Sequence, residues 1–169
     1  LKDNGIKLYA IILPPPESGF GDDKIVNNEK ELEIYNSYIE KIKKCFDKNV
    51  YKYEVYNEPN WNIYTADDIA WYAKIAMSTV KVLNREDRDV IVGATCASGV
   101  ADHKISSIKF FLELNKNDLF KNNISVSYHS YDLAHSFDKL HKELVKNHQN
   151  LFNNLGGFTD IYISEYGVD

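Results

Sequence analysis

Residues 50–59 read V-Y-K-Y-E-V-Y-N-E-P, an aromatic and β-branched run that ends in a polar tip. Such a composition up to Tyr56 is typical of a β-strand, and Pro59 forbids further pairing in a ladder. Glu58 is therefore expected at the tip of the strand, where its side chain can enter a cleft, although a solvated loop glutamate would follow the same pattern. Glu54, in mid-strand, is a different case, since it either faces the covering helices or pairs with a neighbouring cation.

Four further runs have the same strand-like character, and they alternate with segments whose apolar residues recur at helical spacing. The five runs cover residues 6–13, 50–56, 89–95, 124–128 and 160–164. Thr65 and Asp68 form a capping-box pattern before the second helical segment, and Ile108, Phe111 and Leu112 mark the third. This regular alternation predicts parallel strands joined by right-handed crossovers.

Two architectures fit the alternation, a doubly wound open sheet and a (β/α)8 TIM barrel. A nucleotide-binding doubly wound sheet carries a G-x-G-x-x-G loop after its first strand, whereas residues 14–16 here are three prolines. In a barrel, chemistry gathers at the carboxyl ends of the strands, and this chain puts its most unusual residues there. They are Asn57, Glu58, Pro59, Cys96, His129 and Glu165. The α/β TIM barrel is therefore the predicted fold.

A complete barrel needs about 250 residues and eight strands. The chain has 169 residues and five strand signals, so we expect an incomplete barrel fragment of about five βα units. Residues 1–169 are interpreted as the central portion of a single TIM-barrel domain, truncated at both ends. The five strands should then be parallel, in sequential order, and form an open arc.

Composition excludes several classes of protein. Hydrophobic residues make up 44% and charged residues 27%, as in a folded globular domain rather than a disordered tail. The net charge of −5 gives no basic surface for nucleic acid or an anionic membrane, and no apolar run is long enough to span a bilayer. Two cysteines are too few for a disulfide framework. Aromatic residues reach 13%, which suits either a large core or a cleft in which sugars stack.

A second strand run delivers another carboxylate. Residues 161–167 read I-Y-I-S-E-Y-G, so Glu165 closes an apolar strand. Each glutamate alone has an ordinary structural explanation, but two at strand tips three units apart face one another across a barrel mouth. Glycoside hydrolysis requires such a pair, one as acid/base and one as nucleophile. Glu58 would then need a raised pKa to donate a proton, and the charge of Glu165 would raise it.

The same segments resemble those of clan A glycoside hydrolases. Y-E-V-Y-N-E-P-N-W, residues 53–61, looks like the acid/base motif on their fourth strand, and I-Y-I-S-E-Y-G looks like the nucleophile motif on the seventh. Residues 126–131 resemble the sixth-strand His-x-Tyr segment, residues 92–94 the end of the fifth strand, and residues 5–8 the third strand of family 39-like enzymes. The likeness covers essentially the whole chain, strands three to seven, with family 5-like cellulases as the second choice.

The resemblance implies a retaining glycosidase that hydrolyses a β-linked glycan by double displacement, with Glu58 as general acid/base and Glu165 as nucleophile. It also implies an oligo- or polysaccharide substrate and no need for a metal or other cofactor. The residues that would contact the sugar are Asn57, at the 2-hydroxyl, with His129, Tyr131, Trp61 and Asn60. A hydroxyl from Tyr131 or Tyr128 would orient the nucleophile, and packing under its own loop is the alternative for Trp61.

Other patterns favour no second site. His135, His141 and His148 lack neighbouring ligands at zinc spacing and are interpreted as solvated or rim side chains. Cys96 with His129 lacks a third group that would orient a thiol nucleophile.

Alternative functions stay open at this point. They are a non-catalytic carbohydrate-binding relative, an inactive fragment and, less favoured, an α/β nucleotide-binding protein. The resemblance favours a secreted or extracellular protein, with the missing barrel strands of the same domain as structural partners. Neither nucleic acid nor a membrane is an expected partner.

Overall fold

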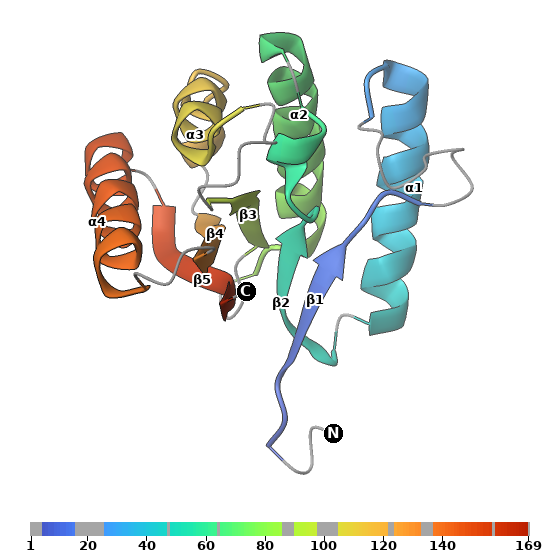
Figure 1. Ribbon diagram of the computed structural model, residues 1–169. Coiled ribbons are helices and arrows are strands. Elements are labelled where there is room, and N and C mark those ends of the chain that lie inside the picture. Colours follow the sequence, from blue (N-terminus) through green and yellow to red (C-terminus); the bar gives the residue numbers. More distant parts are fainter. Residues whose placement is uncertain are drawn as a thin grey trace.

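The computed structural model describes residues 5–15, 26–46, 48–63, 65–85, 90–97, 105–121, 124–132, 137–156 and 158–168. Within these residues, strands and helices alternate along the chain (Figure 1), as the sequence predicts. The strands are β1 (Leu8–Ile12), β2 (Val50–Val55), β3 (Val90–Cys96), β4 (Ile124–Asp132) and β5 (Phe158–Val168). The helices are α1 (Glu29–Phe46), α2 (Ala66–Leu83), α3 (Ser107–Asn115) and α4 (Phe137–Leu155), with short 3-10 helices η3 (Pro59–Trp61) and η4 (Leu119–Lys121).

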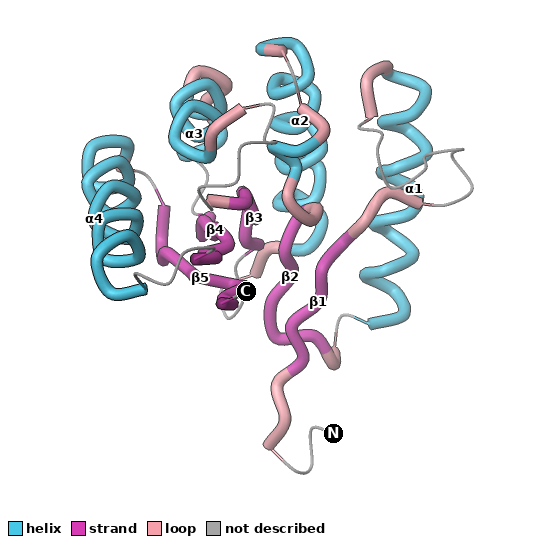
Figure 2. The backbone as a smooth tube through the Cα atoms, viewed as in Figure 1, coloured by secondary structure: helices cyan, strands magenta, loops and turns pink. Residues whose placement is uncertain are grey.

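The five strands form one parallel sheet in the order β1-β2-β3-β4-β5. β1 and β5 are its edges, so the described strands form the predicted open arc rather than a closed barrel. The four helices lie along one face of this sheet (Figures 1 and 2). Each crossover returns over that same face, which is the arrangement of a TIM barrel with its helices outside. The fold is a partial α/β barrel.

Two strands are longer than the sequence predicts. β4 runs to Asp132 and β5 to Val168, whereas the apolar runs end at Tyr128 and Ser164. The pairing continues because a backbone ladder, once in register, does not need apolar side chains. Glu165 therefore lies inside a strand rather than at its tip.

An aromatic and apolar layer fills the space between the sheet and the helices. Tyr53 and Val55 of β2 belong to this layer, while Lys52 and Glu54 alternate with them and face the other side. Edge-on ring contacts run through the layer from Tyr72 to Phe110, Phe111 and Phe152. The inner face of the sheet carries buried polar side chains as well, among them Lys52, Glu54, Ser125, Ser127 and His129. A polar inner face is where a site can form.

The start of α2 confirms the predicted capping box. The hydroxyl of Thr65 accepts the backbone N–H of Asp68 at 3.1 Å, and the carboxylate of Asp68 accepts the backbone N–H of Thr65 at 2.9 Å. The pair satisfies two of the N–H groups that a helix start leaves without intrahelical partners. In the described part of the chain, none of the helices has the length and apolar character needed to cross a bilayer.

The apolar face of α3 differs from the prediction. Of the three expected markers only Phe111 is buried, whereas Ile108 and Leu112 are 36% and 46% exposed. The buried face runs through Phe110, Phe111 and Leu114. Both faces have helical spacing, so periodicity alone could not choose between them.

A β-bulge lies in the middle of β3. The register between β3 and β4 shifts so that Gly93 and Ala94 oppose the single residue Ser127. Gly93 has φ +113° and Ala94 has φ +43°, both in the half of the map that favours glycine. On the helix side, the hydroxyl of Tyr72 accepts the backbone N–H of Gly93 at 2.9 Å and donates to the carbonyl of Val55 at 3.0 Å. The bulge is thus held in place from the core.

Glycine is required at position 93. A Cβ there would lie 2.6 Å from the ring of Phe111 and 2.6 Å from the carbonyl oxygen of Ser127. We expect Gly93→Ala to lower the free energy of unfolding by about 3 kcal/mol, because the positive φ and the clash add. Gly156→Ala is the control, since Gly156 also has a positive φ but an open Cβ position, and it should cost only about 1 kcal/mol. Urea unfolding measures both variants, and equal losses would contradict the role of the clash.

Candidate active site

The turn after β2 presents Glu58. Tyr56 and Glu58 have φ values of +66° and +44°, which residues other than glycine rarely adopt. Pro59 then opens η3, and the backbone N–H of Glu58 donates to the carbonyl of Ala94 at 2.9 Å. The bulge of β3 therefore anchors the turn. Left-handed backbone of this kind persists where the surrounding structure must hold a side chain in one place.

Glu165 reaches the same place from β5. The register of β4 and β5 shifts after Tyr128, and His129 then pairs with Glu165. Ser164 is the unmatched residue of this irregularity. Because directly paired residues of neighbouring strands share a face of the sheet, the shift brings Glu165 to the same face as His129.

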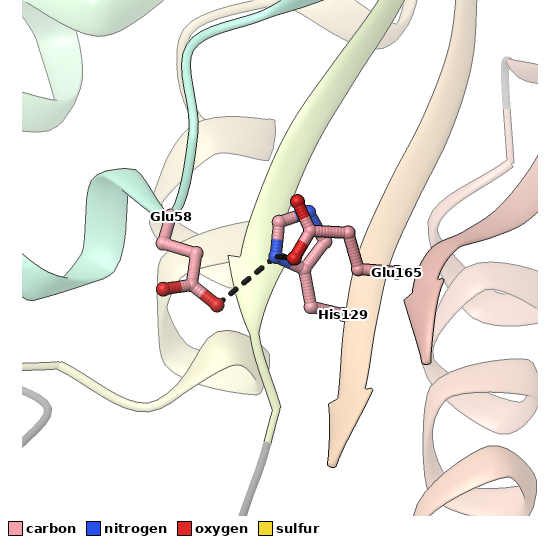
Figure 3. A group of neighbouring side chains, drawn as sticks. All are labelled: Glu58, His129 and Glu165. Atoms are coloured by element: carbon pink, nitrogen blue, oxygen red, sulfur yellow. Dashed lines mark hydrogen bonds and ion pairs between the residues drawn. The ribbon is translucent and has the colours of Figure 1, made fainter. Parts of the chain in front are cut away.

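One ring nitrogen of His129 approaches both carboxylates (Figure 3). Its Nδ1 is 3.0 Å from Oε1 of Glu58 and 3.5 Å from Oε2 of Glu165. An ionised carboxylate only accepts, so Nδ1 carries the proton and donates it to Glu58. One oxygen of each glutamate and a ring nitrogen of His129 all lie within 4.8 Å of one another. His129 is fully buried, whereas the side chains of Glu58 and Glu165 are 21% and 37% exposed and open to a ligand.

His129 also governs the charge state of Glu58. Burial raises the pKa of the Glu58 carboxyl, but the hydrogen bond from His129 and the charge that this ring can carry lower it. The side chains of Cys96 and Trp61 act in the same direction, and the net result is a lowered pKa. The raised pKa expected from the sequence is therefore wrong for this arrangement. The reason is a partner 71 residues away, which the local motif does not reveal.

Comparison with known proteins bears on these two glutamates. The model of the family described as Cellulase (glycosyl hydrolase family 5) matches residues 4–169. The chain belongs to glycosyl hydrolase family 5. It is a clan A glycoside hydrolase, and its family hydrolyses β-glycosides with retention. No curated protein and no solved structure matches the chain.

Family 5 is the second of the two families to which the sequence motifs point. The match covers the acid/base segment, the nucleophile segment and all five strands. The clan is confirmed, and the family 39-like assignment is not.

The structure describes the other predicted sugar contacts of this family 5 domain to different extents. Asn57 is exposed and directly precedes Glu58. Trp61 is half-buried, and its side chain lies close enough to the carboxyl of Glu58 to lower the pKa of that group. Tyr131 pairs with Gly167 through the backbone of β4, and its side chain lies outside the described part of the structure.

Asn60 supports the site rather than lining it. Its side chain is fully buried, and its Oδ1 accepts the backbone N–H of Cys96 at 2.9 Å. Its Nδ2 donates to the carbonyl of Cys96 at 2.9 Å and to that of Ile105 at 3.2 Å. The carboxamide is therefore engaged at both ends and has no surface left for a sugar. The prediction that Asn60 contacts the sugar is therefore corrected. Asn60 is a structural residue that connects η3 to the end of β3.

Cys96 is expected at a strand end from the sequence, but its contact with Glu58 is not. It is buried at the end of β3, and its thiol hydrogen-bonds the Glu58 carboxyl. In this family 5 domain, its position at the end of β3 lets the thiol lower the pKa of the Glu58 carboxyl.

Tyr128 and His148 both pack on the helix side. The two rings stack with centroids 4.3 Å apart, and His148 Nε2 lies 2.8 Å from Oγ of Ser107. His148 is thus a core residue, which corrects its interpretation as a solvated side chain, and Tyr128 is too far into the core to orient Glu165. His135 and the side chain of His141 lie outside the described residues.

The same three side chains are the group that could hold a metal ion. Among the described residues, Glu58, His129 and Glu165 are the His, Cys, Asp or Glu donors that come close enough together. Carboxylate oxygens and an imidazole nitrogen are ligands that Zn²⁺ accepts in proteins. The sequence predicts no metal requirement for this family 5 domain.

Proposed function

We propose that Glu58 is the general acid/base and Glu165 the nucleophile in the double-displacement hydrolysis of a β-linked glycan. The observation that carries this proposal is the closeness of the two carboxylates, since one oxygen of each lies within 4.8 Å of the other and both approach Nδ1 of His129. Carboxyl groups of retaining pairs lie about 5–5.5 Å apart, whereas inverting pairs need about 6.5–9.5 Å to admit a water molecule. The short separation supports the retaining assignment.

The reaction runs in two balanced steps. In the first, a carboxylate oxygen of Glu165 attacks the anomeric carbon as the bond to the glycosidic oxygen breaks, and that oxygen takes a proton from Glu58. In the second, water attacks the same carbon, passes a proton to Glu58 and displaces the carboxylate of Glu165. Both glutamates end in the state in which they began.

In this mechanism, His129 controls the pKa of the Glu58 carboxyl. While Nδ1–H is bonded to Glu58, the pKa of that carboxyl is lowered. A glycosidic oxygen beside Glu58 competes for the carboxyl, and once Glu58 turns away from the ring, burial is left as a cause that raises its pKa. The same Nδ1 lies 3.5 Å from Glu165 and stabilises the charge of the nucleophile.

A change at His129 should therefore move the pH profile. In His129→Ala, the pKa of Glu58 loses its main lowering causes, so the alkaline limb of kcat/KM should shift to higher pH, because Glu58 keeps its proton longer. His129→Gln, which keeps an N–H donor, should leave the limb closer to that of the parent protein. The measurement is kcat/KM against pH for one aryl β-glycoside. A limb that moves to lower pH in His129→Ala would contradict the role given to His129.

Three more residues are proposed as sugar contacts. Asn57 is exposed beside Glu58, and its amide would hydrogen-bond the 2-hydroxyl, a contact that strengthens as the oxocarbenium ion forms. Trp61 contacts Glu58 and would offer part of its indole to the apolar face of a sugar ring. Tyr131 follows His129 by two residues on β4 and would orient Glu165 through its hydroxyl.

We also propose that residues 1–169 are the central portion of one TIM-barrel domain. The support is the two free edges of the sheet, at β1 and β5, together with the large apolar side chains that are exposed along them. These side chains are Tyr9 and Ile11 of β1 and Ile161 and Ile163 of β5. Further strands and helices of the same domain would cover them. Full activity of the 169-residue chain as a monomer would contradict this interpretation.

The experiment that tests the proposed function is hydrolysis by the full-length gene product. A panel of aryl β-glycosides and β-linked polysaccharides should yield at least one substrate that is hydrolysed. The open arc is the observation that favours an inactive fragment, so the 169-residue chain should be assayed beside the full-length product. A folded full-length product that binds polysaccharide but hydrolyses no member of the panel would favour a non-catalytic carbohydrate-binding protein instead.

A further inference from the structure

A third glutamate, unlike Glu58 and Glu165, is fully buried. Glu54 is fully buried on the polar inner face of the sheet, four residues before Glu58 on the same chain segment. Its side chain accepts a hydrogen bond from the hydroxyl of Ser127, which comes from β4, so the two side chains meet across β3. The expectation that Glu54 faces the helices or pairs with a cation is therefore corrected.

Ser127 connects this carboxylate to the bulge of β3. Its Oγ accepts the backbone N–H of Ala94 at 3.0 Å while it donates its own proton to Glu54. The carbonyl of Ala94 accepts the backbone N–H of Glu58 at 2.9 Å. Both polar backbone groups of Ala94 are thus occupied, one by Ser127 and the other by the residue that carries the acid/base carboxyl.

A phenol from the edge strand completes the surroundings of Glu54. Tyr9 of β1 lies beside it, and burial, followed by the charge and hydrogen bond of Glu54, raises the pKa of this phenol. Tyr9 also contacts Ser164, the residue before Glu165. Side chains from β1 and β4 therefore meet Glu54 of β2, and Tyr9 extends these contacts to Ser164 of β5.

From this geometry we propose that Glu54 and Ser127 are a positioning pair that fixes the Ala94 bulge and so holds Glu58 where it can protonate the glycosidic oxygen. The inference rests on the proposed function, because it presupposes that Glu58 is the acid/base. The hydroxyl of Ser127 is held at both ends, because it accepts the N–H of Ala94 and donates to the buried side chain of Glu54. The pair acts through the position of the turn and touches no substrate.

The test compares two leaving groups in the full-length gene product. A 2,4-dinitrophenyl β-glycoside leaves without a proton, whereas the phenyl β-glycoside of the same sugar needs one. Ser127→Ala should lower kcat/KM for the phenyl substrate by roughly tenfold more than for the dinitrophenyl substrate, because a misplaced acid loses only the proton-transfer contribution. Glu54→Gln should act in the same direction, and Ser127→Thr, which keeps the hydroxyl, should restore most of the difference.

Thr79→Val is the matched control. It also removes a buried hydroxyl, one that bonds to Tyr35 at 2.9 Å between α1 and α2. A purely structural loss of this kind should lower kcat/KM for both substrates by the same factor. If Ser127→Ala does not fold, Glu54→Gln alone carries the comparison.

The outcomes separate the two proposals. If Glu58→Ala shows the leaving-group dependence and neither Glu54→Gln nor Ser127→Ala does, the positioning pair is overturned and the proposed function stands. If Glu58→Ala itself shows no dependence, the acid/base assignment fails and the positioning pair fails with it. Both proposals are supported if the ratio of kcat/KM for the two substrates changes in Glu58→Ala, Glu54→Gln and Ser127→Ala. The same ratio should stay unchanged in Thr79→Val.

Discussion

Glu165→Gln should lower kcat for aryl β-glycosides by roughly 10⁴-fold or more, since removal of a catalytic nucleophile costs losses of this order. An amide has nearly the same shape as a carboxylate but cannot form the glycosyl-enzyme bond. The contact with His129 at 3.5 Å can persist through the amide oxygen, so the fold should be preserved. Steady-state kinetics and urea unfolding of the same preparation check both statements.

The matched control is Glu113→Gln. Glu113 pairs with Lys116 at 2.7 Å on α3, away from the two carboxylates, and the substitution makes the same chemical change. It should leave kcat unchanged and cost well under about 1 kcal/mol of unfolding free energy, as expected for a pair near the surface. An active Glu165→Gln protein would remove Glu165 from the nucleophile role.

Glu58→Ala has the second large effect, and this effect should depend on the substrate. For a leaving group that needs a proton, loss of the general acid should lower kcat/KM by roughly 10²–10⁴-fold. For a dinitrophenyl glycoside the first step needs no acid, so the loss should be much smaller and the glycosyl-enzyme should accumulate. A loss of equal size for both substrates would contradict the acid role.

Azide distinguishes the two glutamates from each other. In Glu58→Ala, azide should attack the anomeric carbon of the glycosyl-enzyme, displace the carboxylate of Glu165 and give a β-glycosyl azide. In Glu165→Ala, azide would take the place of the nucleophile on the opposite face and give the α-glycosyl azide. NMR of the two products reads the anomeric configuration, and reversed configurations would exchange the two roles.

Local patterns in the sequence predicted the architecture well. Alternating strand and helix signals gave a parallel sheet in sequential order, and the capping box at Thr65 and Asp68 forms as expected. Local spacing does not identify the buried face of α3, since Ile108 and Leu112 have the spacing of a buried stripe but are exposed. The apolar run also ends before β5 does, because pairing with β4 and not the apolar run decides where that strand stops.

The residues of the candidate site were predictable from the sequence, but the contacts among them were not. Glu58, His129 and Glu165 were each expected near a strand end, and the fold brings them together. The lowered pKa of Glu58 and the buried role of Asn60 were not predictable, because both depend on partners that lie far away in the sequence. A motif names the residue types of a site, while their partners depend on the sheet.

Some contacts had no signal in the sequence. Glu54 and Ser127 are 73 residues apart and meet across β3, which carries a bulge opposite Ser127. A mid-strand glutamate and a strand serine are both ordinary, and neither predicts the other. In the sequence, Gly93 belongs only to the segment that resembles the end of the fifth strand of clan A enzymes. Its positive φ is a consequence of the bulge, which the sequence does not predict.

The most direct test of the two-glutamate account is to identify the residue that becomes glycosylated. A 2-deoxy-2-fluoro β-glycoside with a dinitrophenyl leaving group slows the second step, so the glycosyl-enzyme should accumulate on the full-length gene product. Peptide mass spectrometry should then find the fluorosugar on Glu165, within the segment Ile161-Tyr162-Ile163-Ser164-Glu165. A fluorosugar attached to Glu58 or to any other residue would contradict the account.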